Sequence, residues 1–233
     1  GDYKWVRVLD SFEMYVHKDD KSVSPHLEKD GYWESWITIW FMHNVGPGTV
    51  LFDIGANAGY YSFLAHYLGA MVAAFEPNPI YFDMINATRD RHEILTGFHT
   101  HNVALSDKSG EMTLHIPDGL HGSASLNDIP PGYSFSDIIV NVDRLDNIYK
   151  TAGAGRQILK IDAEGEEERV IRGAEKFLSQ TPHKMMVIEH TPKAYSKDFL
   201  SELDKRWTMK RIDFDGSLKP VTHKWVEQQR DWV

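Results

Sequence analysis

Two hydrophobic patterns alternate along most of this chain, one typical of buried strands and one typical of helices. Short continuous apolar runs at residues 49–54, 71–75 and 157–161 are typical of parallel strands that are buried on both faces. Apolar residues spaced three and four apart at residues 60–68 and 79–91 are typical of helices. Strands that alternate with helices predict an α/β fold with a mostly parallel sheet, right-handed crossovers and helices on both faces.

The same patterns continue through the rest of the chain. We expect further strands at residues 98–105, 111–116, 137–142 and 184–188, helices at 166–178 and 199–207, and strand-like residues towards 214 and near 221. In such a sheet, ligands bind outside the carboxyl ends of the strands, where the strand order reverses. The residues directly after each strand are therefore the first candidates for a site.

The N-terminal part of the chain follows a different pattern. Residues 5–9 and 12–16 read as two short strands, and a polar loop follows them. The segment 32–45 is rich in aromatic residues, and its apolar positions recur at helical spacing until a Gly-Pro-Gly sequence ends it. We therefore predict two parts: N-terminal strands and an aromatic-rich helix over residues 1–45, packed on a core domain over residues 46–233.

Composition narrows the class of protein. Apolar residues make up 42% of the 233 residues, enough for one sizeable core, and no uncharged apolar run is long enough to cross a membrane. The net charge is −9 with scattered lysines and arginines, which disfavours nucleic acid as a partner. There is no cysteine, which suits a reducing cytoplasm. We expect a cytoplasmic protein; whether a targeting segment precedes Gly1 stays open.

The first buried strand runs into the sequence DIGANAG, a turn of small residues that starts at Asp53 and enters a helix. Small residues let the backbone approach a ligand closely. A nicotinamide dinucleotide site needs G-x-G-x-x-G, and Asn57 and Tyr60 stand where its second and third glycines belong. Asp53 would repel a pyrophosphate, whereas it suits a cofactor that is cationic there, such as S-adenosylmethionine. The alternative is a tight turn without a ligand.

Glu76 follows the next strand, in the sequence FEPNP. It stands about twenty residues after Asp53, near the spacing expected for an acid that accepts hydrogen bonds from ribose hydroxyls. Pro77 and Pro79 end the strand and start the next helix. The alternative role for Glu76 is to support the helix start without binding a ligand.

Charged residues also follow the strand at 157–161. Lys160 and Asp162 share one side of that strand. Charged groups on a buried strand must be paired with an opposite charge or contact a ligand. Asp162 and Glu164 precede the next helix, and we expect both to face the crevice. The glutamates at 166–168 fall in the first helical turn, where the helix dipole favours them, so they receive no role in the site.

Glu189 and His190 close the strand at 184–188. A histidine titrates near neutral pH and is a natural general base, with a hydrogen-bonded structural histidine as the alternative. These two residues, Asp162 and Glu164 carry oxygen and nitrogen ligands for a divalent metal, but no ligand spacing supports one. A metal is thus possible but unsupported, and no metal ligand is assigned.

Four stretches together resemble the FkbM-type family of S-adenosylmethionine-dependent methyltransferases. They are FDIGANAG at 52–59, FEPNP at 75–79, NVALSD at 102–107 and ILKIDAEG at 158–165. The resemblance covers roughly residues 33–190 and implies a Rossmann-like class I methyltransferase fold with a mostly parallel seven-stranded sheet. It further implies S-adenosylmethionine as methyl donor and a hydroxyl acceptor on a sugar, glycan or polyketide-type small molecule.

The resemblance also assigns residues to the cofactor. These are Asp53, Gly55, Ala56, Asn57, Gly59, Glu76, Pro77, Asn102, Val103 and Asp162. Asp53, Gly55 and Asn57 would line the methionine end of the cofactor. Glu76 would bind its ribose, and Asn102 and Val103 would lie by the adenine. An alcohol is a poor nucleophile, so a base should take its proton. The candidates are, in falling order, His190, Asp162 and Glu164, while Lys160 would balance buried carboxylate charge.

Three alternatives remain at this point. A non-catalytic module would bind S-adenosylmethionine and pair off Asp162, Glu164 and His190. A nicotinamide-dependent oxidoreductase would need the glycines that Asn57 and Tyr60 replace, and a nucleic-acid methyltransferase would need a basic surface. The loop 121–125, from His121 onward, reads as an ordinary glycine–serine loop, with closure over the site as the alternative. The identity of the acceptor and the oligomeric state are not set by the sequence.

Overall fold

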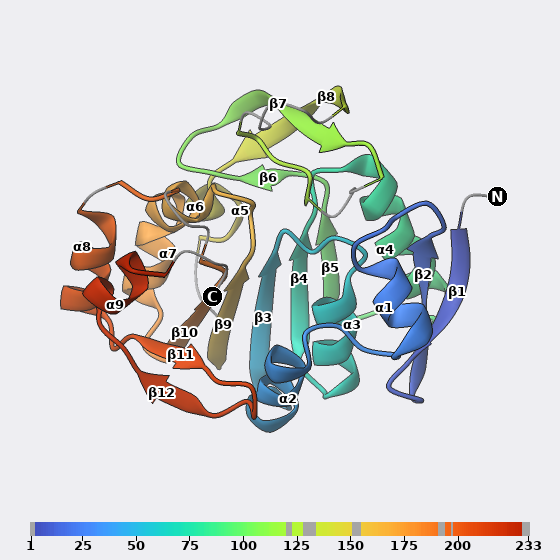
Figure 1. Ribbon diagram of the computed structural model, residues 1–233, viewed down its shortest axis with the longest axis horizontal. Coiled ribbons are helices and arrows are strands. Elements are labelled where there is room, and N and C mark those ends of the chain that lie inside the picture. Colours follow the sequence, from blue (N-terminus) through green and yellow to red (C-terminus); the bar gives the residue numbers. More distant parts are fainter. Residues whose placement is uncertain are drawn as a thin grey trace.

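The computed structural model describes residues 3–119, 123–127, 134–150, 155–190, 194–196 and 198–229. At its centre lies a five-stranded sheet in the order β10-β9-β3-β4-β5, in which every pair of neighbours is parallel (Figure 1). Its strands are β3 (Thr49–Ile54), β4 (Met71–Phe75), β5 (Phe98–His101), β9 (Arg156–Ile161) and β10 (Lys184–Ile188). The parallel sheet predicted from the apolar runs is confirmed.

Helices cover both faces of this sheet, and each face has its own core (Figure 1). On one face lie α2 (Ser35–Asn44), α3 (Tyr60–Tyr67) and α4 (Pro79–Arg91). On the other lie α5 (Leu145–Ile148), α6 (Glu167–Gly173), α7 (Glu175–Gln180), α8 (Phe199–Arg206) and α9 (His223–Glu227). Successive strand residues point to opposite faces, so Leu51 packs in the first core and Phe52 in the second.

The number of strands in the central sheet differs from the expected seven. Among the described residues it has five strands, because the two short strands after α8 pair with each other instead of joining it. These are β11 (Lys210–Ile212) and β12 (Leu218–Pro220), joined by a turn in which Gly216 takes a φ of 76°. With three residues each, they satisfy one another's backbone groups in a small antiparallel ladder.

A second, three-stranded sheet lies above the carboxyl ends of the central strands (Figure 1). We call it the roof sheet; it consists of β6 (Ala104–Leu105), β7 (Gly110–Pro117) and β8 (Phe135–Asp143), in the order β6-β8-β7. The predicted single strand at 98–105 is wrong in this respect, since it divides into β5 and β6. Between them the Asn102 side chain donates to the backbone carbonyls of Glu76 and Pro77, at 2.9 and 3.0 Å, and draws the chain off the sheet.

Other differences concern short helices. The predicted helix at 166–178 breaks at Ala174, which has a φ of −112°, into α6 and α7. The helices α1 (Ser24–Lys29), α5 and α9 were not expected. The polar loop before residue 32 contains α1 because the Asp20 carboxylate accepts the backbone N–H groups of Val23 and Ser24, at 3.1 and 2.8 Å.

None of the helices in the described ranges has the length and apolar character that a membrane span requires.

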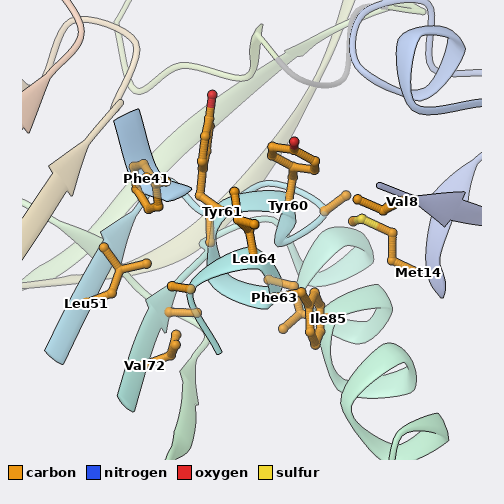
Figure 2. Close-up of a cluster of buried hydrophobic side chains, with 14 of the residues drawn as sticks. Val8, Met14, Phe41, Leu51, Tyr60, Tyr61, Phe63, Leu64, Val72 and Ile85 are labelled. Atoms are coloured by element: carbon orange, nitrogen blue, oxygen red, sulfur yellow. The ribbon is translucent and has the colours of Figure 1, made fainter. Parts of the chain in front are cut away.

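The N-terminal strands form a hairpin, β1 (Tyr3–Val8) and β2 (Phe12–His17), that packs on α4. Val8 and Met14 from the hairpin are fully buried in the same cluster as Ile85 of α4 (Figure 2). The backbone N–H of Tyr15 also donates to the Thr88 hydroxyl at 3.0 Å. Burial of each such side chain contributes roughly 1.5–3 kcal/mol, so the hairpin is held mainly by apolar contact.

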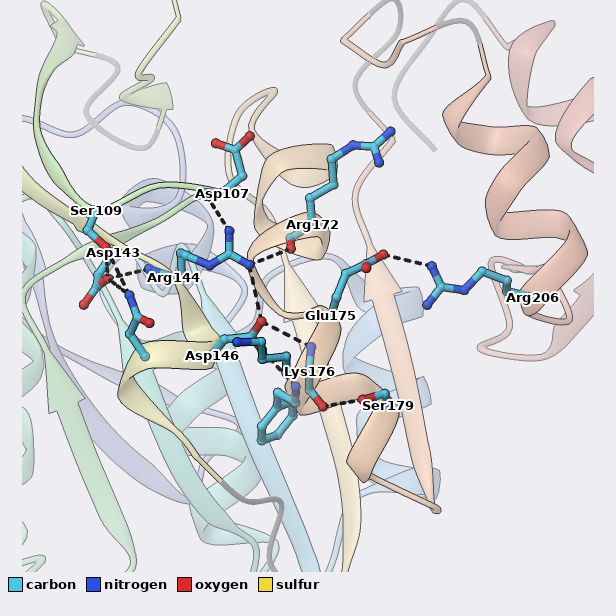
Figure 3. A network of polar contacts seen from close by, with 12 residues as sticks. Asp107, Ser109, Asp143, Arg144, Asp146, Arg172, Glu175, Lys176, Ser179 and Arg206 are labelled. Atoms are coloured by element: carbon cyan, nitrogen blue, oxygen red, sulfur yellow. Dashed lines mark hydrogen bonds and ion pairs between the residues drawn. The ribbon is translucent and has the colours of Figure 1, made fainter.

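On the opposite face, Asp146 of α5 connects this helix to α7 (Figure 3). Its carboxylate accepts the backbone N–H groups of Lys176 and Phe177 in the first turn of α7, at 3.2 and 2.8 Å, and lies 3.4 Å from the Arg144 guanidinium. Asp146 is buried, whereas the neighbouring ion pair between Arg206 and Glu175 has both side chains 52% exposed. Asp146 therefore caps α7 from a different part of the chain.

We expect Asp146→Ala to lower the free energy of unfolding by about 2–3 kcal/mol, since a buried and a partly buried N–H group would lose a charged acceptor. Arg206→Ala serves as the control and should change it by less than about 1 kcal/mol, because exposed ion pairs contribute little. Urea denaturation followed by circular dichroism measures both. Equal losses in the two variants would contradict this account of Asp146.

Candidate functional site

A cleft lies at the carboxyl end of the central sheet, between the strand ends and the roof sheet. The cavity has a volume of about 80 Å³ and opens to solvent. Its floor comes from the segments after β3, β4 and β9, and its ceiling includes Leu114, Ala124 and Leu126. This is the edge of the sheet where the ends of parallel strands are expected to hold a ligand.

The turn after β3 passes very close to the segment after β9. Gly55 has a φ of 75°, and a Cβ atom on it would lie 1.8 Å from the carbonyl oxygen of Asp162. Only glycine allows both this backbone conformation and this approach. The N–H groups of Gly55 and Ala56 both donate to the Phe75 carbonyl, each at 3.0 Å, so the turn is also held by the end of β4.

Glu76, the first residue after β4, ties two turns together. Its carboxylate accepts the backbone N–H groups of Asn57 and Asn78, each at 2.8 Å. Burial raises the pKa of Glu76 to about 7, although both N–H donors act in the opposite direction. The carboxylate lies on the wall of the cleft. A strong acceptor therefore lies at the ligand-facing end of β4.

Lys160 lies between two carboxylates at the junction of β3 and β9. Its Nζ atom is 3.0 Å from Oδ2 of Asp162 and 3.8 Å from Oδ1 of Asp53. Asp53 also accepts a hydrogen bond of 2.6 Å from the Ser62 hydroxyl. Burial raises the pKa of Asp53. For Asp162 burial acts in the same direction, but the charge of Lys160 and the hydrogen bonds with Glu189 and Lys160 together outweigh it, so the pKa lies below its usual range.

Two further carboxyl groups lie beside Asp162. Burial, followed by the charge of Asp162, raises the pKa of Glu164 to about 8. The same two causes raise the pKa of Glu189 well above its usual range, and Glu189 shares a hydrogen bond with Asp162. The negative charge of Asp162 thus opposes ionisation of Glu189. Glu164 lies on the wall of the cleft.

Glu34 and Tyr61 lie beside Lys160, although neither belongs to the described lining of the cleft. The Tyr61 hydroxyl donates to Oε2 of Glu34 at 2.7 Å, and Nζ of Lys160 lies 5.1 Å from the centre of the Tyr61 ring. Figure 2 shows the Tyr61 side chain rising from the start of α3. Glu34 directly precedes α2 with a φ of 40°, a conformation uncommon for glutamate. No sequence pattern signals such a contact, because it depends on how α2 meets α3.

The structure brings together most of the residues expected around a cofactor. The cleft is lined by Gly55, Asn57, Glu76, Pro77, Val103, Asp162 and Glu164. Ala56, Gly59, Asn102 and Asp53 do not belong to its lining among the described residues. Asp53 is wholly buried with Lys160, and the Asn102 side chain is occupied by backbone carbonyls.

His190 lies at the end of β10, outside the described lining of the cleft. Its ring is buried and stacks on Tyr195 with centroids 5.5 Å apart, and burial lowers its pKa. Neither ring nitrogen has a hydrogen-bond partner within the part of the chain that the structure describes.

His121 lies outside the described residues. In the described ranges no three histidine, aspartate or glutamate side chains are grouped so as to hold a metal ion.

Comparison with known proteins places this site in a family. A family model described as the methyltransferase FkbM domain matches residues 53–214. The 31-O-demethyl-FK506 methyltransferase FkbM of Streptomyces tacrolimicus is 32% identical over 55% of this chain and 60% of its own length. The chain therefore matches less than two thirds of that relative.

Solved structures show a partial likeness. The precorrin-6y C5,15-methyltransferase of Geobacter metallireducens overlaps 76% of this chain and 71% of its own, with a TM-score of 0.43 and 14% identity. The tRNA (uracil-54, C5)-methyltransferase of Pyrococcus abyssi, in complex with S-adenosyl-L-homocysteine, overlaps 85% of this chain and 37% of its own, with a TM-score of 0.44 and 11% identity. The sequence match over residues 53–214 carries the assignment: this chain belongs to the FkbM methyltransferase family.

Proposed function

We propose that this protein is an S-adenosylmethionine-dependent O-methyltransferase that acts on a hydroxyl group of a sugar, glycan or polyketide-type small molecule. Family membership and the methyltransferase name of the Streptomyces relative support this proposal. We include in it a small-molecule or glycan acceptor, no nucleic-acid partner and a cytoplasmic location, the last in keeping with the lack of cysteine.

The observation that carries the proposal is the charge of the cleft. Its described lining includes Glu76, Asp162, Glu164 and Glu166, and no lysine, arginine or histidine. Because the pKa values of Glu76 and Glu164 are raised to about 7 and about 8, this wall carries its full negative charge only at alkaline pH. In that ionised state it repels the pyrophosphate of a nicotinamide dinucleotide and favours a cationic ligand. S-adenosylmethionine is cationic at its ammonium and sulfonium groups.

The residues present fit the parts of this cofactor. Each carboxylate oxygen of Glu76 uses one lone pair for a backbone N–H, and a further lone pair on each is available to ribose hydroxyls. The apolar side chains of Val103, Leu114 and Leu126 offer a surface for a flat base. Asp53 would act only through its charge, since it is buried beside Lys160. When bound, S-adenosylmethionine supplies an electrophilic methyl group.

For proton removal we propose Glu164 ahead of His190 and Asp162, whereas the order expected from the sequence put Glu164 last. Asp162 is paired with Lys160 and has a lowered pKa, so it is a weak base. His190 does not line the described cleft. Glu164 does, and with a pKa near 8 its carboxylate binds a proton more strongly than an ordinary glutamate. In this role, Glu164 takes the proton of the acceptor hydroxyl.

Isothermal titration with S-adenosylmethionine, S-adenosylhomocysteine and NAD tests the proposed cofactor. We expect micromolar binding of the two adenosyl ligands and no binding of NAD, because the lining is acidic. Binding of NAD alone would show that the acidic wall has been misinterpreted.

We expect Glu76→Ala to weaken S-adenosylhomocysteine binding by about tenfold to a hundredfold. The reason is the loss of hydrogen bonds to a charged acceptor, each contributing roughly 1.5–3 kcal/mol. Glu111→Ala on β7 removes an exposed carboxylate of the same type and should leave the affinity unchanged. The assignment of Glu76 to the ribose fails if both variants bind like the wild type.

The pH dependence of methyl transfer distinguishes the candidate bases. Because the pKa of Glu164 is raised to about 8, its carboxyl group is protonated and inactive below that pH and ionised above it. With a hydroxyl acceptor found by screening, we expect kcat to rise with a midpoint near pH 8 and to reach its plateau about one pH unit higher. Glu164→Gln should lower kcat by roughly 10²–10⁴.

Saturating cofactor keeps the titration of Glu76, whose pKa is about 7, out of this profile. His190→Gln is the matched control and should retain most of the activity. A midpoint below pH 6.5 that disappears in His190→Gln would assign the base to His190, whose pKa is lowered by burial.

A further inference from the structure

Glu164 has a backbone conformation that its own side chain does not favour. Its φ is 50° and that of the next residue, Gly165, is 99°, so two successive residues lie in the left-handed region. For a non-glycine residue this conformation costs roughly 1–2 kcal/mol and persists only where neighbouring contacts impose it. The contacts around Glu164 should therefore show what holds it.

From inside the protein, Glu167 holds the residues on either side of Glu164. Its Oε1 atom accepts the N–H groups of Ala163 at 3.1 Å and Gly165 at 3.0 Å. Glu167 is 0% exposed, so these bonds are shielded from water. This carboxylate fixes the loop against α6 but leaves the carbonyl group of Glu164 free for other donors.

From the roof side, two side chains hold that carbonyl. The Ser125 hydroxyl donates to the oxygen of Glu164 at 2.8 Å, and Nδ2 of Asn127 donates to the same oxygen at 3.3 Å. Ser125 in turn accepts the N–H of Asn127 at 3.0 Å, so its proton is committed to Glu164. Neither residue lines the cleft, although Ala124 and Leu126 beside them do.

Ser125 is itself attached to the roof sheet. It exchanges two backbone hydrogen bonds with His115 of β7, at 2.9 and 3.0 Å. On the other side of the contact, a Cβ atom on Gly165 would lie only 2.9 Å from Nδ2 of Asn127. The loop after β9 and the segment 123–127 therefore fit closely together, with glycine at the tightest point.

We propose that Ser125 and Asn127 are positioning residues that clamp the Glu164 backbone to the roof sheet and so hold the Glu164 carboxylate in the cleft. The clamp orients this side chain by fixing the carbonyl of its own residue, while Glu167 fixes the two adjacent amides. Its value for catalysis rests on the proposed function, in which Glu164 receives the proton of the acceptor hydroxyl.

The test compares Ser125→Val with Ser125→Thr, because valine and threonine have nearly the same shape and differ in the hydroxyl group. Hydrogen exchange of the peptide over residues 162–168 measures how firmly the loop is held. We expect exchange there to be about fivefold to tenfold faster in Ser125→Val, and close to wild type in Ser125→Thr. Exchange of the peptide over β3 should be the same in all three proteins.

The carboxyl carbon shift of Glu164 in NMR gives a second readout that a general loss of stability would not move. Burial in the clamped loop keeps the pKa of Glu164 near 8, and we expect Ser125→Val to bring it down towards the usual range of glutamate. Ser125→Thr should restore it. Identical exchange and identical titration in the two variants would overturn the clamp, as would faster exchange spread evenly over β3 and the loop.

Both readouts use the protein without a ligand. Failure to bind S-adenosylhomocysteine would therefore count against the proposed function and leave the clamp standing. If Ser125→Val and Ser125→Thr behave alike in hydrogen exchange and in the Glu164 titration, the clamp proposal is wrong, whereas the proposed cofactor is unaffected.

Discussion

The ionic contact of Lys160 with Asp162 and Asp53 is the interaction on which the site depends. Asp53 and Lys160 are register partners on β3 and β9, and the side chains of both are almost completely buried. Removing one partner of a buried pair leaves an uncompensated charge, which is strongly destabilising. The lysine thus permits two carboxylates to stand at adjacent strand ends, and the turns that follow these strands form the floor of the cleft.

A second constraint acts on the backbone at the same place. Gly55 passes so close to the carbonyl of Asp162 that any side chain would collide with it. The charge pair and the glycine contact together set the distance between the ends of β3 and β9. Glu76 connects the end of β4 to the turn after β3, because its carboxylate accepts the N–H groups of Asn57 and Asn78. Three strand ends are therefore held by side chains as well as by the ladder between the strands.

The central strands and long helices were predictable because their apolar patterns are continuous and extend over whole elements. Glu76, Asp162 and Glu164 were also identified as cleft residues, since each lies within three residues of the end of a buried strand. The burial of Asp53 could not be read from its position in the turn motif, because it depends on its pairing with Lys160 across strands. The placement of Glu34 beside Tyr61 and of Ser125 beside Glu164 involves segments far apart in sequence.

The side chain of Asn102 has a consequence at the edge of the sheet. By bonding to the carbonyls after β4, it ends β5 at His101 and leaves an outer strand of only four residues. An unpaired edge strand offers its free N–H and C=O groups to other chains and can nucleate aggregation, and short edge strands reduce that danger. One amide side chain thus helps to shape the binding cleft and also shortens the stretch of β5 on which a foreign strand would be able to pair.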